Sequence, residues 1–249
     1  MAETNWYTCC ERVEPYIFKI LTPRGSGTGF FLGYSGTKKL CGIATAAHVI
    51  DQSFYWEEPI RLVHQESGEA VFLRPEDRII YVDERRDTAS VIFNPKKLRL
   101  PSEAPALISA GKHLKVGVDI GWMGFPAVSP NNLCLFRGSV SCWLKDDSAY
   151  LLDGVVINGV SGGPVFSGYV DGSFRIAGVV SAYLPNRATG VSLPGLCLAS
   201  DVGPFYETLA KLKDFDAAKN EEKKPEQPPA TPTPTAKPLE GEPQGFVRS

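Results

Sequence analysis

Short apolar runs alternate with turn residues along most of the chain. The runs are rich in β-branched and aromatic residues, and Gly, Pro and Asn separate them. Runs of this length and composition are typical of β-strands. In the first half of the chain, we expect strands at residues 16–21, 29–32, 42–45, 60–63, 70–73 and 89–93.

The second half repeats this pattern, so the sequence predicts an all-β protein. Residues 98–112 separate the two halves, and Pro101 and Pro105 suit a linker there. After this linker, we expect strands near residues 118–126, 136–141, 155–157, 163–166, 174–183 and 195–199.

A helix is expected after the last strand, over residues 201–215. Apolar residues recur there three to four positions apart, which places them on one face of a helix. Ser200 or Asp201 can cap the start of this helix. The face expected to contact the core consists of Val202, Phe205, Leu209 and Leu212.

The composition changes at residue 216, where Lys, Glu, Pro and Thr become dominant. Seven prolines lie between Pro225 and Pro243. Such a segment cannot bury enough apolar surface to fold, so we expect residues 216–249 to be disordered. This tail acts either as a linker or as a docking segment for a partner protein with a groove for extended Pro-rich peptide.

The composition also limits the classes of partner. The 249-residue chain is 43% hydrophobic and 22% charged, which is typical of a globular protein with a sizeable core. Its formal net charge of −2 and its lack of a basic cluster argue against nucleic-acid binding. No stretch approaches the roughly 18 apolar residues that span a bilayer, and no secretory signal is evident. We therefore expect a cytoplasmic protein with no membrane partner.

The six cysteines do not favour disulfides. Cys134 and Cys142 fall on one extended segment, and eight residues of strand span about 26 Å, which is beyond disulfide reach. We therefore expect free and mostly buried thiols. No C-x-x-C pair or histidine cluster has metal-ligand spacing, so neither a metal site nor another cofactor is expected.

Three segments carry residues suited to nucleophilic catalysis. Residues 158–164 read N-G-V-S-G-G-P, which places Ser161 where its own backbone N–H can help to hold the oxyanion that it creates. Upstream, His48 in A-T-A-A-H-V is a candidate base. Asp87, which opens D-T-A-S-V-I-F, is a candidate carboxylate to orient that base. A serine in a glycine-rich turn is usually only a turn residue, but the other two segments favour a catalytic triad.

The order His48, Asp87, Ser161 is that of chymotrypsin-type barrels, and subtilisins and α/β-hydrolases have other orders. Together the segments resemble the trypsin-like (chymotrypsin-fold) serine peptidases, especially the bacterial branch that includes the HtrA-type proteases. Residues 25–30 (G-S-G-T-G-F) look like the hairpin of that branch, and residues 136–141 look like its G-x-V-S strand. The resemblance covers residues 12 to 210.

This resemblance implies two six-stranded antiparallel β-barrels of the chymotrypsin/trypsin type, a C-terminal helix and the Pro-rich tail. Barrel one would comprise residues 12–100, barrel two residues 112–200 and the closing helix residues 201–215. The peptidase domain would therefore span residues 12–215, followed by the disordered tail at 216–249.

The resemblance also implies the activity of a serine endopeptidase. His48 would take the proton of the Ser161 hydroxyl as this oxygen attacks a peptide carbonyl, and Asp87 would fix the imidazole tautomer. The backbone N–H groups of Gly159 and Ser161 would form the oxyanion hole. For the two other histidines, His64 and His113, we expect packed or surface positions.

Two neighbouring acidic residues, Asp83 and Glu84, could be argued for the carboxylate from proximity alone. Asp87 fits better because it opens an apolar run much like the family's Asp-x-Ala-x-x pattern. Asp83 and Glu84 are interpreted as solvated loop charges.

The resemblance suggests where a substrate binds. Val155 stands where trypsins hold the aspartate that attracts Arg or Lys, and Val156 is beside it, so an apolar or small residue is expected before the scissile bond. Ser181, Ala182 and Tyr183 resemble the family's Ser-Trp-Gly edge, which pairs with the substrate backbone. Tyr183 either partly closes the pocket or is an ordinary aromatic residue of the sheet.

Two departures from digestive trypsins concern activation. Val160 replaces the aspartate before the nucleophile, and no Ile-Val-Gly-Gly start exists, so pairing of a freed N-terminal ammonium with that aspartate has no participants. Control would have to come from a partner, from oligomerisation or from an oxyanion loop that rests in an inactive conformation.

Our leading interpretation is a serine endopeptidase that acts on a restricted protein or peptide substrate. The alternative is a catalytically silent scaffold with the peptidase fold, which binds partner peptides through its groove or its Pro-rich tail. An esterase acting on small acyl substrates would share the mechanism of the peptidase.

Overall fold

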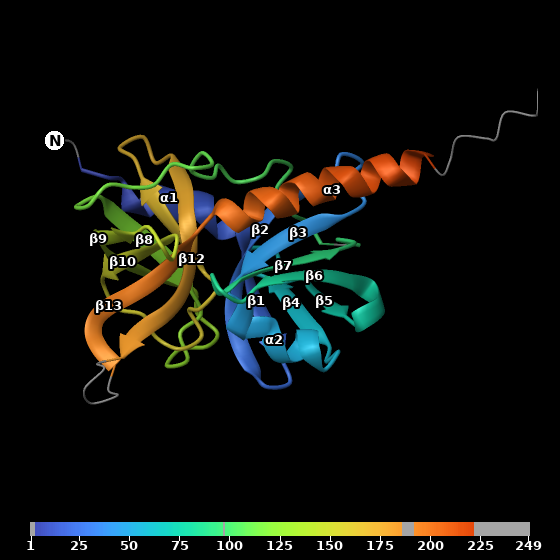
Figure 1. Ribbon diagram of the computed structural model, residues 1–249, viewed down its shortest axis with the longest axis horizontal. Coiled ribbons are helices and arrows are strands. Elements are labelled where there is room, and N and C mark those ends of the chain that lie inside the picture. The colour runs from blue at the N-terminus through green and yellow to red at the C-terminus, as the bar shows by residue number, and fades with distance from the viewer. Residues whose placement is uncertain (1–2, 97, 186–191, 222–249) are drawn as a thin grey trace, which may run out of the picture.

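Two antiparallel sheets lie side by side in the computed structural model, which describes residues 3–96, 98–185 and 192–221 (Figure 1). The first sheet has seven strands in the order β5-β4-β1-β2-β3-β7-β6, and the second is a closed barrel in the order β10-β13-β12-β11-β8-β9. The expected all-β fold of the chymotrypsin type is confirmed. Each half of the chain therefore forms one sheet.

The first sheet differs in detail from the six-stranded closed barrel that we expected. Within the described residues its edge strands, β5 and β6, do not pair with each other. The additional strand is β6, where five of six residues are half-buried. Neither face of this strand is fully buried, so its sequence lacks a clear alternation of apolar and polar residues. The strands are β1 (Ile17–Thr22), β2 (Gly25–Tyr34), β3 (Cys41–Thr45), β4 (Ile60–His64), β5 (Ala70–Leu73), β6 (Arg78–Asp83) and β7 (Thr88–Phe93).

The second sheet closes into a barrel of six strands, as expected. The strand expected at residues 155–157 is wrong: these residues belong to no strand, and the strand before them covers residues 149–153. Cys134 and Cys142 both belong to its strand β9, and all six cysteines are free thiols. Cys9, Cys41 and Cys197 are buried, and the others are half-buried. The strands are β8 (Asp119–Gly124), β9 (Cys134–Leu144), β10 (Ala149–Asp153), β11 (Pro164–Gly168), β12 (Phe174–Pro185) and β13 (Ser192–Asp201).

The helices are α1 (Trp6–Val13), α2 (Ala47–Tyr55) and α3 (Gly203–Glu221), with 3-10 turns at Glu14–Tyr16 and Pro75–Asp77. Helices α1 and α2 were not expected. Helix α3 continues through residues 216–221, which we expected to be disordered. Ala, Lys and Glu in this stretch are good helix formers. The rest of the expected tail, residues 222–249, lies outside the described residues. No helix in the described ranges is long and apolar enough to cross a bilayer.

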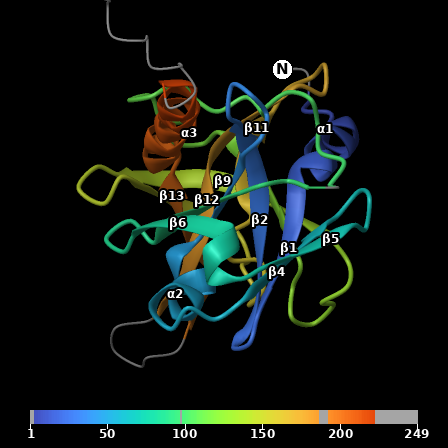
Figure 2. The same cartoon turned by 90° about the vertical axis from the view of Figure 1, so that its right-hand side faces the viewer.

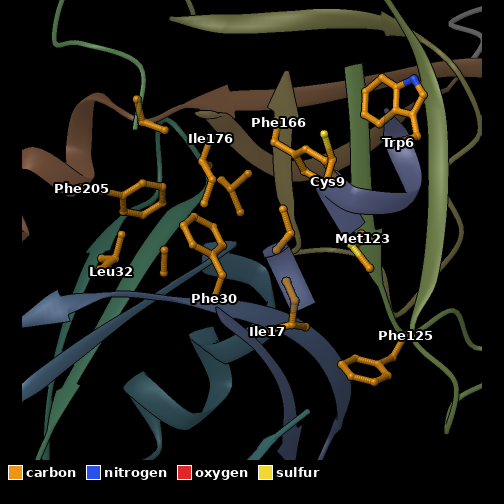
Figure 3. Packing of buried hydrophobic residues seen from close by; sticks show 14 residues of the cluster. Trp6, Cys9, Ile17, Phe30, Leu32, Met123, Phe125, Phe166, Ile176 and Phe205 are labelled. Carbon is orange, nitrogen blue, oxygen red and sulfur yellow. The ribbon is translucent and has the colours of Figure 1, made fainter. Parts of the chain in front are cut away.

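The core between the two sheets fixes their relative position. Helix α3 begins beside the barrel and runs over the first sheet, with α2 on the opposite side of that sheet (Figures 1 and 2). Phe205 of α3 packs edge-on against Phe30 of β2, with 5.9 Å between ring centroids (Figure 3). Trp6 of α1 packs against Phe166 of the barrel, also at 5.9 Å. Because α1 fills this core, the fold begins before residue 12, where we expected the domain to start.

Candidate active site

His48 follows strand β3, and Asp87 directly precedes strand β7. These two strands are paired, which brings the two residues together. Thr45 at the end of β3 is opposite Ala89 near the start of β7. His48 Nδ1 lies 2.8 Å from Oδ2 and 3.0 Å from Oδ1 of Asp87. The backbone N–H of His48 also donates to Oδ1, at 3.0 Å. The carboxylate therefore holds both the ring and the backbone of the histidine.

Asp87 adopts a backbone conformation that few residues tolerate. Its φ is +48°, in the left-handed region that Asp and Asn enter more readily than most residues. Its own carbonyl accepts from the N–H of Ala47 at 3.1 Å. On the other side, the Ser181 hydroxyl donates to Asp87 Oδ2 at 2.5 Å. Ser181, which we expected at the substrate edge, thus contacts the carboxylate through its side chain.

Electrostatics favour an ionised carboxylate beside a basic imidazole. The hydrogen bond with Asp87 raises the pKa of His48, burial opposes this, and the charges of Asp87 and Asp51 add to it. Burial of Asp87 opposes its ionisation, but the hydrogen bonds from His48 and Ser181 outweigh burial and hold its pKa below the usual value. Asp83, the rejected alternative, instead binds Arg86 at 3.3 Å.

The turn between β10 and β11 that carries Ser161 depends on two glycines. Gly159 has a φ of +91°, and a Cβ there would lie 2.3 Å from the carbonyl oxygen of Phe125. Gly162 has a φ of +84°, and its Cβ would lie 2.1 Å from the carbonyl oxygen of Thr28. Neither position can accept another residue without moving backbone atoms. The glycines that mark this segment in the sequence are therefore required by the turn itself.

The backbone of this turn leaves two N–H groups unpaired. The Asn158 carbonyl accepts from the N–H of Ala127 at 2.7 Å. Because the C=O and N–H of a trans peptide point in opposite directions, the N–H of Gly159 points away from Ala127. In the described part of the chain, neither the N–H of Gly159 nor that of Ser161 donates to a protein acceptor. Two donors close in sequence are thus available to a ligand.

A cavity of about 230 Å³ brings His48 and Ser161 to one surface. Its walls are the β1–β2 hairpin, the start of α2 and the turn at Asn158–Ser161, and its charged lining residues are Arg24 and Asp51. Both His48 and Ser161 are described, and no hydrogen bond joins their side chains. The cavity therefore presents a candidate nucleophile and a candidate base that are not hydrogen-bonded to each other in the described structure.

Three of the five residues expected to bind substrate, Val155, Val156 and Ser181, do not line this cavity. Val155 is 53% exposed, and its carbonyl accepts from Trp122 Nε1 at 3.2 Å. Val156 packs against the core of the barrel. Among the described side chains, neither valine nor Ser181 lines the cavity. Ala182 and Tyr183 belong to β12, but their side chains lie outside the described part of the structure.

The other histidines have structural partners. His64 is buried, with Nδ1 at 2.9 Å from Ser67 Oγ and Nε2 at 2.8 Å from the Pro15 carbonyl oxygen. His113 stacks on Trp143 with 4.8 Å between ring centroids. Over residues 3–96, 98–185 and 192–221, no group of three or more His, Cys, Asp or Glu residues could hold a metal ion.

Solved structures of proteases share this fold. Deg5 matches with a TM-score of 0.59 and 19% identity, over 82% of this chain and 90% of its own. The Rv3671c protease of M. tuberculosis, in an inactive form, matches with a TM-score of 0.57 and 20% identity, over 82% and 92%. The serine endoprotease from Yersinia pestis matches with a TM-score of 0.62 and 16% identity, over 85% and 68%. At these identities the likeness establishes the fold alone.

Comparison of the sequence itself identifies the family. No curated protein matches the chain. The trypsin-like peptidase domain family matches residues 27–173, which is more than half of the chain and contains His48, Asp87 and Ser161. The chain therefore belongs to the family of trypsin-like peptidase domains, as its sequence motifs indicated.

Proposed function

We propose that this protein is a serine endopeptidase that hydrolyses peptide bonds in a restricted protein substrate. The observation that carries the proposal is the 2.8 Å contact between His48 and Asp87, together with the cavity that His48 and Ser161 both line. Gly159 and Ser161 also line this cavity, and their N–H groups have no acceptor among the described residues. A nucleophile, an oriented base and oxyanion donors are the groups that acyl transfer requires.

In the proposed reaction, Asp87 keeps the proton of His48 on Nδ1, so that Nε2 is free to accept one. Ser161 Oγ attacks the carbonyl carbon of the substrate as its proton passes to Nε2. His48 then gives this proton to the leaving amine, which leaves an acyl group on Ser161. Water then attacks the acyl carbon while His48 takes its proton. His48 returns this proton to Ser161 Oγ as the carboxylic acid is released. The absence of a hydrogen bond between His48 and Ser161 in the described structure is consistent with this scheme, because catalytic hydrogen bonds often tighten only with substrate bound.

The negative oxygen of the tetrahedral intermediate would lie between the N–H groups of Gly159 and Ser161. Because the Asn158 carbonyl is bound by Ala127, it does not occupy this position. These bonds favour a turn that is ready for substrate in the resting protein. Control by a partner or by oligomerisation therefore has more support than control by an inactive resting turn.

The proposed substrate preference concerns the residue before the scissile bond and the edge strand that would bind the substrate backbone. Val156 is an apolar, half-buried residue close to the nucleophile in sequence, which supports an apolar or small residue before the scissile bond. The backbone of β12, from Ser181 to Tyr183, would pair with the substrate as an added strand. The Pro-rich tail would dock a partner protein.

Labelling with an alkyl fluorophosphonate tests the proposal. The wild type should gain one phosphonyl adduct in its intact mass, and Ser161→Ala and His48→Ala should gain none while they keep their circular dichroism spectra. No adduct on folded wild-type protein would favour the catalytically silent scaffold. An adduct without cleavage of any peptide in a proteome-derived library would favour an esterase.

A further inference from the structure

One residue of the first sheet contacts the Ser161 turn at two points. Thr28 of β2 is fully buried, with 0% of its side chain exposed. Its hydroxyl donates to the Gly159 carbonyl at 2.8 Å, and its backbone N–H donates to the Ser161 carbonyl at 2.9 Å. Its own carbonyl accepts from the Thr45 hydroxyl at 2.7 Å. Thr28 thus holds the carbonyl groups of both residues whose N–H groups are unpaired.

The Thr28 hydroxyl has a second partner, in the segment that follows β8. The N–H of Phe125 donates to Thr28 Oγ1 at 3.1 Å. Two residues further along, Ala127 binds the Asn158 carbonyl. The Thr28 hydroxyl therefore joins the Gly159 carbonyl to the segment that contains Phe125 and Ala127. Ala127 of the same segment binds the carbonyl of the preceding residue, Asn158. A threonine hydroxyl has one proton to donate and lone pairs to accept, so both bonds form at once.

The first sheet holds the far end of this segment as well. The ammonium group of Lys19 on β1 donates to the Pro130 carbonyl and, at 3.2 Å, to Asn131 Oδ1. The segment is thus fixed to the first sheet at Phe125 by Thr28 and at Pro130 and Asn131 by Lys19. Rotation of the Asn158–Gly159 peptide would break the bond to Ala127. The Thr28 bond holds the Gly159 carbonyl, on the other side of the Gly159 Cα from that peptide.

We propose that Thr28 is a positioning residue, and that its hydroxyl orients the N–H of Gly159 toward the oxyanion of the reaction. This inference rests on the proposed function. It assigns the role to the hydroxyl rather than to the volume of the side chain. Valine, which has nearly the same shape and no hydroxyl, would leave the Gly159 carbonyl without a donor and the Phe125 N–H without an acceptor.

The experiment measures the maximal rate (kinact) and the half-saturating concentration (KI) of labelling by an alkyl fluorophosphonate. Thr28→Val should lower kinact by about 10- to 100-fold, less than the 10²–10³ that direct loss of an oxyanion donor costs. KI should stay within about twofold, since the uncharged probe binds before charge develops. Thr28→Ser should restore kinact to within about threefold. The pH profile of kinact, which His48 sets, should stay unchanged in both variants.

A matched control is Thr88→Val on β7. Thr88 is 1% exposed, and its hydroxyl has no hydrogen-bond partner among the described residues, so the same substitution removes a buried hydroxyl without removing a bond. It should leave kinact at the wild-type value. This control separates the loss of the Thr28 bonds from a general effect of the exchange of Thr for Val.

Each outcome decides between the alternatives. Equal kinact values for Thr28→Val and wild type would overturn the inference, and so would equal losses in Thr28→Val and Thr28→Ser. If Thr28→Val does not fold, Thr28→Cys replaces it: a weaker donor should lower kinact at constant KI, and a wild-type kinact would overturn the inference. No labelling of the wild type would overturn the proposed function and this inference with it.

Discussion

The hydroxyl of Ser181 donates a 2.5 Å hydrogen bond to the carboxylate of Asp87, so a strand of the barrel holds an acidic residue of the first sheet. The same carboxylate accepts from the ring and from the backbone N–H of His48. Donors from strand β12 of the barrel and from helix α2 therefore converge on one charge. This arrangement keeps Asp87 ionised despite its partial burial.

Loss of the Ser181 hydroxyl should weaken the proposed triad without removing a member of it. In Ser181→Ala the pKa of Asp87 should rise toward its usual value, because one hydrogen bond to the charged form is gone. The carboxylate should also orient His48 less well. We expect kinact with the fluorophosphonate to fall about tenfold, the effect of about 1.4 kcal/mol.

Ser200→Ala provides the control for Ser181→Ala. Its hydroxyl also joins the barrel to the first sheet, but it donates to the carbonyl of Arg86 rather than to the carboxylate. Each substitution should lower the free energy of unfolding by about 1 kcal/mol, and only Ser181→Ala should lower kinact. Equal losses of kinact in both variants would mean that the sheet contact matters and the carboxylate bond does not.

Residue types and their order along the chain predicted most of the strands and the contact between His48 and Asp87, but not β6 or β10. Asp87 was preferred over Asp83 because it opens an apolar run, and the structure brings Asp87 to His48 and Asp83 to Arg86. Helix α1 was missed although Asn5 caps it, with a side chain that accepts from the N–H of Thr8 at 3.1 Å. Its capping signal was readable in the sequence.

Contacts between the two sheets were beyond the reach of the sequence patterns. Thr28 lies in G-S-G-T-G-F, and its neighbouring glycines predict a hairpin and nothing about Gly159, which is 131 positions away. The hydroxyl of Ser181 contacts a carboxylate 94 positions earlier. Local periodicity reports which face of a strand is buried, whereas these contacts depend on how the sheets pack against each other.

Gly159→Ala should damage both the turn and the activity. A Cβ would lie 2.3 Å from the Phe125 carbonyl oxygen, and the φ of +91° is strained for any residue with a Cβ. Displacement of the N–H should lower kinact by about 10²-fold or more. The free energy of unfolding should fall by about 2 kcal/mol or more.

The stability control for this variant is Gly25→Ala, where a Cβ would meet nothing within 4 Å. Urea denaturation should place Gly25→Ala within about 0.5 kcal/mol of the wild type. If Gly159→Ala matched the wild type in its free energy of unfolding and in kinact, the turn would accommodate a Cβ. The assignment of Gly159 to the oxyanion site would then fail.

Phe205→Ala should loosen α3 from the first sheet. The side chain is fully buried and packs edge-on against Phe30 at 5.9 Å. Removal of a buried aromatic ring costs about 3–5 kcal/mol, which chemical denaturation would detect. Tyr7→Ala, at a residue that is 75% exposed, should change the free energy of unfolding by less than about 0.5 kcal/mol. Similar values for the two variants would contradict the packing of α3.

Asp87→Asn should move the acid limb of the pH–rate profile to lower pH. The base must be neutral to accept a proton, so the rate falls as the pH drops through the pKa of His48, which the Asp87 hydrogen bond raises above the usual 6.5. Without the carboxylate, burial is opposed only by the weaker charge of Asp51, and the pKa should fall. The plateau rate should drop by about 10⁴-fold.

Two matched variants identify the group responsible for this pH dependence. In Asp83→Asn the carboxylate lost is one that binds Arg86, so the acid limb should not move. In Asp51→Asn only a charge contribution to the pKa of His48 is lost, so the limb should move down by less than in Asp87→Asn. NMR titration of the His48 ring, with Ser161→Ala added to each variant, measures the pKa directly. An unchanged pKa in Asp87→Asn would mean that the 2.8 Å contact does not control the base, and the proposed role of Asp87 would be wrong.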